Sequence, residues 1–224
     1  PSDQEYTVRS LSRVEAMERS ALESTLPWSW ETFGEYLDLL DDSVGVNVLA
    51  MVGHSAVRRY VMGEDATQRT ASQEEIQAMC LVVRESLRAG AMGFTSTRAG
   101  VHWDGEGQPV PSRLATEDEY RALVSEMAGM RSGFIQGISP PELNVELARR
   151  AGRPYLSSPV THTLRRHPGE WRQQLERLQL EIENGGRTFG MGPVNRTQYE
   201  MTMENTSFFD RWPQSCWWHV TLQP

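Results

Sequence analysis

The fold is decided by two stretches, Val44-Gly-Val-Asn-Val-Leu-Ala-Met-Val-Gly-His54 and Gly90-Ala-Met-Gly-Phe-Thr-Ser-Thr-Arg98. Each is a short apolar run that stops on polar or charged side chains, which is typical of a buried strand. Between them, Ser72 and Glu75 form a capping-box pattern, and apolar residues then recur at helical spacing. Functional side chains of parallel α/β proteins lie where strands end. We therefore expect chemistry at His54 and at residues 95–98.

The same alternation continues along the chain. Three further strands are predicted at residues 133–138, 155–160 and 187–191. Helical patterns cover residues 8–22, 30–40, 55–62, 141–151 and 171–182, and Thr116 with Glu119 begins another as a second capping-box pattern. This order predicts an α/β fold, a partial or atypical (β/α) TIM-type barrel of parallel strands. We expect a single α/β domain over residues 1–224, the central portion of a barrel, with an irregular Trp-rich tail at residues 194–224.

Composition narrows the function. The net charge of −8 and the pI near 5.2 argue against nucleic acid or an anionic membrane as partner. No run reaches the roughly 18 apolar residues of a membrane span. The chain starts at Pro1 without an initiator Met or a signal segment, which indicates an excerpt or a processed chain. Cys80 and Cys216 do not make a disulfide framework, so we expect a cytoplasmic protein, with Cys80 as a buried thiol.

All 22 basic residues are Arg. Without Lys, this chain cannot form a Schiff base, use a Lys general base or offer a carbamylated Lys to two metals. Zinc signatures of the His-x-His, His-Glu-x-x-His or Cys-x-x-Cys type are absent, as is a Gly-x-Ser-x-Gly nucleophile motif. The chain by itself therefore supports no metal ligand and no cofactor.

Several polar residues at strand ends are candidates for the site. His54 suits a metal ligand, a proton shuttle or a substrate contact, and the alternative is a His that orders the loop through backbone hydrogen bonds. Ser96, Thr97 and Arg98 offer hydroxyls and a guanidinium that could bind a substrate carboxylate, or Arg98 could instead pair with an acidic side chain. His102 lies in the long loop after this strand and joins His54 as a catalytic candidate.

Later candidates carry a weaker signal. His162 and His167 are five residues apart, which is not the spacing that places two ligands on one helix face, so a surface loop is favoured. Asn195 and Arg196 follow the last predicted strand, and Arg196 is a candidate substrate-binding residue.

A series of motifs resembles a known family. The stretches Trp30-Glu-Thr-Phe-Gly-Glu-Tyr-Leu37, Asn47-Val-Leu-Ala-Met-Val-Gly-His-Ser-Ala-Val-Arg58 and Gly90-Ala-Met-Gly-Phe-Thr-Ser-Thr-Arg98 follow in order. The series resembles the D-aminoacylase branch of the amidohydrolase superfamily, N-acyl-D-amino-acid deacylases and their relatives. The resemblance is strongest over residues 28–131. It implies a metal-dependent (β/α) barrel, with zinc as cofactor, that hydrolyses the amide of an N-acylated D-amino acid.

The chain also departs from this family. The family's His-x-His and its bridging Cys or Glu would lie before Pro1. Where active members carry a His-x-Arg, this sequence reads Gly133-Phe-Ile-Gln-Gly-Ile138. Arg98 and His102, followed by Gly107-Gln-Pro-Val-Pro111, match a divergent subgroup more closely.

Two hypotheses follow. In the first, the protein is a hydrolase of a linear amide C–N bond in an N-acylated amino acid or a related amide, with His54, Arg98 and His102 shaping the pocket. In the second, the chain is a catalytically silent barrel-like module or subunit that associates with a partner, either a second copy or the missing barrel half. An incomplete barrel has open sheet edges, which favour such association.

Overall fold

The computed structural model describes residues 3–15, 17–41, 43–100, 102–157, 160 and 169–192. Its strands form one parallel sheet in the order β1-β2-β3-β4-β5. The strands are β1 Val52–Gly53, β2 Gly93–Thr97, β3 Phe134–Ile138, β4 Tyr155–Ser157 and β5 Thr188–Gly190. The predicted α/β class with parallel strands is confirmed.

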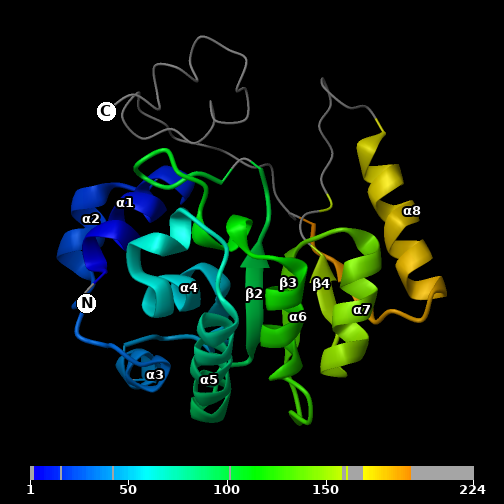
Figure 1. Cartoon of the computed structure of the whole chain (residues 1–224), viewed down its shortest axis with the longest axis horizontal. Helices are drawn as coiled ribbons and strands as arrows, with labels where there is room; N and C mark the ends of the chain where they lie inside the picture. The colour runs from blue at the N-terminus through cyan, green and yellow to red at the C-terminus, as the bar shows by residue number, and fades with distance from the viewer. Residues whose placement is uncertain are drawn as a thin grey trace.

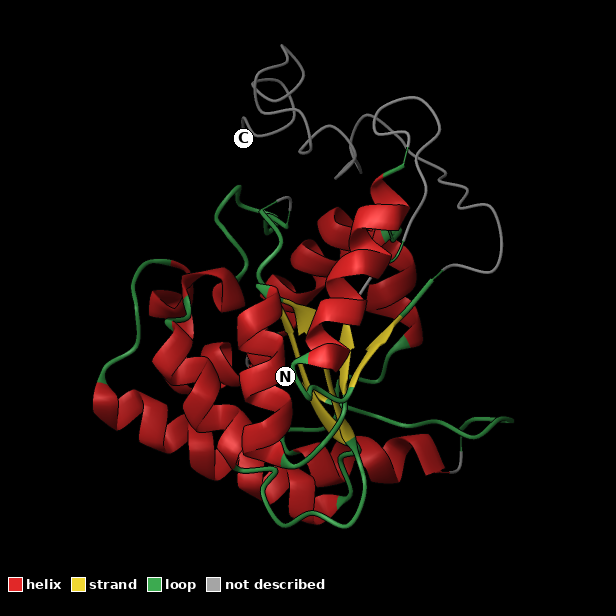
Figure 2. Ribbon diagram, turned by 90° about the vertical axis from the view of Figure 1, so that its right-hand side faces the viewer, coloured by secondary structure: helices red, strands yellow, loops and turns green. Residues whose placement is uncertain are grey.

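Helices connect the strands and precede the sheet. They are α1 Gln4–Glu15, α2 Arg19–Thr25, α3 Phe33–Asp41, α4 His54–Met62, α5 Gln73–Ala89, α6 Glu117–Ser125, α7 Pro141–Ala151 and α8 Glu170–Glu183, with short 3₁₀ helices η1 Gly63–Thr67 and η2 Pro111–Leu114. Consecutive parallel strands joined by right-handed crossovers place their helices on one face of the sheet. Figure 1 shows α5, α6 and α7 alongside β2, β3 and β4 in this way, and Figure 2 shows the strands as one sheet.

The two faces of the sheet differ because side chains alternate along a strand. On β2, Phe94 and Ser96 are buried on the helix side, whereas Thr95 and Thr97 are partly exposed. The same alternation leaves Gln136 of β3 partly exposed. The face without helices corresponds to the interior of a (β/α) barrel. Thr95, Thr97 and Gln136 are polar side chains on this face, which by the same alternation also carries Phe134 and Ile138 of β3.

The hydrophobic core lies between the sheet and the helices. Met79 and Val83 of α5 and Leu123 of α6 are fully buried in one cluster with Phe94. Burying a side chain of this size contributes about 1.5–3 kcal/mol. The core thereby fixes α4, α5 and α6 against β2, and with them the residues at the strand ends.

The first strand is shorter than residues 44–54, the range that we predicted. The register places Val52 opposite Phe94, and β2 begins only one residue earlier. Upstream of Val52 a single backbone hydrogen bond is described to the segment before β2, from Met92 to the carbonyl of Ala50 at 2.8 Å, and Val46 and Leu49 are 75% and 62% exposed. The prediction of one helix over residues 8–22 was also wrong, because the extended backbone of Glu18 separates α1 from α2.

Candidate functional site

A cavity of about 410 Å³ lies at the carboxyl ends of β1, β2 and β3. Four residues singled out from the sequence line it: His54, Ser96, Thr97 and His102. The strand ends do bring these side chains together, as expected for parallel strands. The full lining is Val14, Glu15, Gly53, His54, Ser55, Thr95, Ser96, Thr97, His102, Ser112, Gln136, Gly137 and Ile138.

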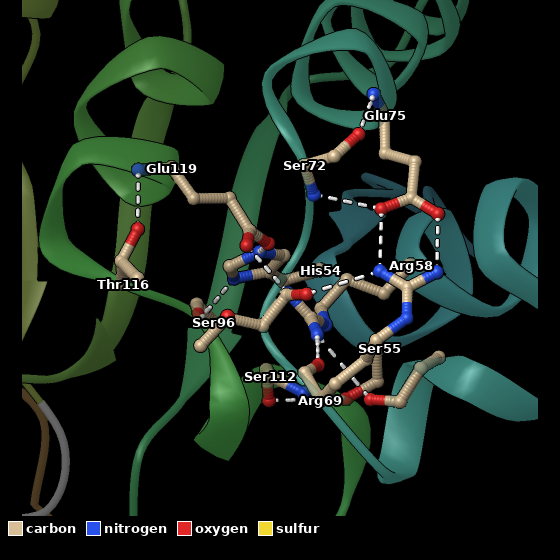
Figure 3. Close-up of polar contacts among 12 residues, drawn as sticks. His54, Ser55, Arg58, Arg69, Ser72, Glu75, Ser96, Ser112, Thr116 and Glu119 are labelled. Carbon is tan, nitrogen blue, oxygen red and sulfur yellow. Dashed lines mark hydrogen bonds and ion pairs between the residues drawn. The ribbon is translucent and has the colours of Figure 1, made fainter.

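His54 is the first residue of α4, directly after β1, and its ring is held on both sides. Its Nδ1 lies 2.9 Å from the Oγ of Ser96, and its Nε2 lies 2.8 Å from an oxygen of Glu119. The second oxygen of Glu119 pairs with the guanidinium of Arg58. All four side chains are buried, and Figure 3 shows His54 between Ser96 and Glu119.

The hydrogen bonds determine which atom carries each proton. A carboxylate only accepts, so the Nε2–H of His54 donates to Glu119. Burial lowers the pKa of His54, although the bond to Glu119 acts against this, and the ring is therefore neutral. A neutral ring leaves Nδ1 as an acceptor, and Ser96 donates its hydroxyl proton to it. Burial would raise the pKa of Glu119, but His54 and Arg58 outweigh burial and lower it.

Glu119 and Arg58 were missed as site residues because each has an ordinary local explanation. Thr116 and Glu119 match a capping box, but only half of it forms: Thr116 accepts from the Glu119 N–H at 3.1 Å. The Glu119 carboxylate turns instead to His54 and Arg58. The sequence feature that could have indicated the Glu119 contact is Arg58, which lies four residues after His54 on the same face of a short helix. A buried Arg needs a counter-ion.

Thr97 and His102 form a second pair on the open side of the sheet. The Thr97 Oγ1 lies 2.8 Å from His102 Nδ1. The backbone carbonyl of Thr97 accepts a hydrogen bond from the Ser112 hydroxyl at 2.7 Å, and the carbonyl of His102 accepts one from Arg113 at 2.9 Å. These bonds tie the loop after β2 to the strand end and hold the His102 ring at the cavity wall.

Arg98 lies apart from this cavity lining. Burial raises the pKa of Tyr120 and Tyr155, and the charge of Arg98 acts against that rise, so its guanidinium is within electrostatic reach of both phenols. The Nη1 atom of Arg98 is buried without a hydrogen-bond partner in the described part of the chain.

The other residues singled out from the sequence are not in the described lining of the cavity. Arg196, His162, His167 and the Trp-rich tail lie outside the described residues. Cys80 is partly buried, and burial raises the pKa of its thiol to about 11, so it stays protonated at neutral pH.

Comparison with known proteins identifies the family. The sequence profile of the amidohydrolase family matches residues 13–207. The chain belongs to the amidohydrolase family. An uncharacterized protein of Mycobacterium tuberculosis is 35% identical over 124 residues, which are 51% of this chain and 20% of that protein. A D-aminoacylase of Alcaligenes xylosoxydans xylosoxydans is 36% identical over 92 residues, covering 41% of this chain and 17% of the enzyme.

Solved structures of the family share the fold. An N-acyl-D-glutamate deacylase from Bordetella bronchiseptica, complexed with zinc and a phosphonate inhibitor, superposes with a TM-score of 0.56 at 23% identity. That match covers 70% of this chain and 33% of the enzyme. A D-aminoacylase in complex with copper chloride gives 0.55 at 21% identity, over 75% and 34% of the two chains. This amidohydrolase chain thus spans about a third of the solved chains and a fifth or less of the curated relatives.

The described residues do not offer a set of ligands for a metal ion. Among them, no three His, Cys, Asp or Glu side chains gather into a set that could hold an ion. In the cavity, His54 uses one ring nitrogen for Ser96 and the other for Glu119, so neither is left for a metal. In the described part of this amidohydrolase, no helix has both the length and the apolar character needed to cross a bilayer.

Proposed function

We propose that this amidohydrolase hydrolyses a linear amide C–N bond, as an N-acyl-D-amino-acid deacylase does, with a small N-acylated amino acid or related amide as substrate. One observation carries the proposal. The cavity opens at the carboxyl ends of β1, β2 and β3, where enzymes with (β/α) barrels place their chemistry, and it carries a His held by a neighbouring hydroxyl. The names of the D-aminoacylase relatives supply the substrate class.

Within this proposal His102 is the proton-transfer residue. Its ring lines the cavity, and Thr97 fixes its orientation through Nδ1. Ser96, Thr97, Arg98 and Arg196 are the substrate-binding residues of this proposal: Thr97 lines the cavity on the open face of the sheet, and Arg98, which lies outside the lining, supplies the positive charge for a substrate carboxylate. His54 was predicted to be catalytic; we propose that it acts by positioning Ser96, because both its ring nitrogens are occupied and its pKa is lowered.

Zinc belongs to this proposal only through the family. None of the described residues is proposed as a ligand for it.

The test is release of free amine. Purified protein is incubated with N-acetyl-D-amino acids and their L-enantiomers, with added zinc and with a chelator, and the product is measured with an amine-reactive dye. We expect release from the wild type and a large loss in His102→Ala. Release equal in the wild type and His102→Ala would refute the role of His102. No release under any condition would refute the proposed reaction.

The open sheet edges favour a second candidate, a module that completes its sheet against a partner. β1 and β5 each have one neighbour among the described strands, and Val46 and Phe189 near these edges are 75% and 56% exposed. Size-exclusion chromatography with light scattering tests this candidate. A stable monomer across a wide concentration range would contradict it.

A further inference from the structure

Two polar side chains on the open face of the sheet have no hydrogen-bond partner among the described residues. Thr95 of β2 and Gln136 of β3 lie opposite each other in the register, and both line the 410 Å³ cavity. Within the described part of the chain, neither side chain makes a hydrogen bond. Both are partly exposed, so they can be reached from the cavity.

The other hydroxyls of the cavity wall are already committed. Ser96 donates to His54, Thr97 bonds to His102, and Ser55 donates to Ser112 at 3.0 Å. Ser112 in turn donates to the carbonyl of Thr97. A ligand in this cavity therefore meets Thr95 and Gln136 with their hydrogen-bonding capacity unspent, beside the exposed carboxylate of Glu15.

The charges around the cavity are mixed, because Glu15 at the end of α1 brings a carboxylate to the lining while the charges of Arg58 and Arg98 also act on His54, which is itself neutral. The described lining contains no Arg side chain, so a ligand carboxylate beside Thr95 and Gln136 would have no guanidinium partner there. An amide group presents both a donor and an acceptor without charge, and the Gln136 carboxamide can match either.

We propose that Thr95 and Gln136 form an amide-recognition subsite. The Gln136 side-chain oxygen accepts the N–H of the ligand amide, and the Thr95 hydroxyl donates to its carbonyl oxygen. This deepens the proposed function, on which it rests, by assigning the part of the cavity that distinguishes an amide from an ester. Gln136 and Thr95 are thus specificity-determining residues.

The test compares two ligands that differ by one N–H. N-acetyl-D-alanine is the amide, and O-acetyl-D-lactate replaces its N–H by an ester oxygen. Dissociation constants are measured by NMR titration of the ¹⁵N-labelled 224-residue chain, following the side-chain amide signal of Gln136. One net hydrogen bond corresponds to about a three- to tenfold preference for the amide.

The variants separate the two contacts. Gln136→Leu is expected to bring the amide-to-ester ratio close to one, because only the amide has the N–H. Thr95→Val is expected to weaken both ligands equally by about three- to tenfold, because both keep the carbonyl. Gln136→Glu retains an acceptor oxygen and should keep the preference while weakening both anionic ligands. Gln77→Leu, on the exposed face of α5, is the matched control and should change neither constant.

The outcomes distinguish this inference from the proposed function. The subsite would be overturned if Gln136→Leu still preferred the amide, or if the amide ligand did not shift the Gln136 signal. Either result would hold even if the protein releases amine. The subsite would be supported if Gln136→Leu lost the preference for the amide and Gln136→Glu kept it, even if no amine is released.

Discussion

Replacing Glu119 by Gln should destabilise the protein strongly. Glu119 is fully buried and accepts from His54 with one oxygen while the other pairs with Arg58, which is also fully buried. In Glu119→Gln the amide oxygen can still accept from His54. The amide NH₂ then faces the Arg58 guanidinium, so two donors meet and a buried positive charge loses its counter-ion.

The magnitude follows from this uncompensated charge. Removing one partner of a buried ion pair costs about 3–5 kcal/mol, because the remaining charge stays desolvated. Among the described residues Arg58 then keeps two backbone carbonyls as acceptors, those of Arg69 at 2.9 Å and Ala66 at 3.4 Å, and neither neutralises it. For a domain of this length the loss corresponds to a decrease in Tm of about 6–20 °C.

Urea unfolding followed by tryptophan fluorescence measures the effect, provided the m-value is unchanged. Glu126→Gln is the matched control, since Glu126 pairs with Arg84 at 2.7 Å but Arg84 is 44% exposed. Exposed pairs contribute about 0–1 kcal/mol, so the control should lose little. A loss below 1 kcal/mol in Glu119→Gln, equal to that of the control, would refute the reasoning.

Three further predictions concern pH and packing. The free energy of unfolding should fall on acidification below about pH 6.5. Burial holds the folded-state pKa of His54 below its unfolded value, so the unfolded ring binds protons that the folded ring does not. The lowered pKa of Glu119 adds a second loss of stability below about pH 4.3. A flat Tm from pH 7 to pH 4 would contradict this. Burial raises the pKa of Glu181, so Glu181→Gln should raise the free energy of unfolding at pH 7. Calorimetry should show this gain disappear at low pH, where the wild-type carboxyl is protonated. Gly137→Ala should lower the free energy of unfolding in urea by about 1–3 kcal/mol, because its Cβ would lie 2.5 Å from a backbone oxygen of Ser96. In the control Gly45→Ala the Cβ meets open space, and the change should stay within about 0.5 kcal/mol. Equal losses in the two variants would refute the packing argument.

The sequence located the cavity because parallel strands end at one edge of a sheet. The patterns at residues 44–54, 90–98 and 133–138 indicated strands, and the side chains that follow them do line one cavity. The resemblance to amidohydrolases likewise needed only the order of the motifs. Both features are local or follow from connectivity, and neither depends on side-chain contacts.

The contacts of each polar side chain could not be predicted from the sequence in the same way. Ser72 with Glu75 and Thr116 with Glu119 are the same motif in the sequence, yet only the first forms a complete capping box. The second differs because α4 brings His54 and Arg58 to the Glu119 carboxylate. That contact joins residues more than sixty positions apart, and no local pattern encodes it.

The sequence by itself determined the strand order, the amidohydrolase family and the edge of the sheet where chemistry is expected. Only the tertiary structure decided which face of the sheet each side chain lies on. The face of the sheet covered by helices takes Ser96 into the buried His54 network and leaves Thr95, Thr97 and Gln136 facing the cavity. The physical reason is the two-residue alternation of a strand: the sequence contains the alternation, but the packing of the helices determines which half is buried.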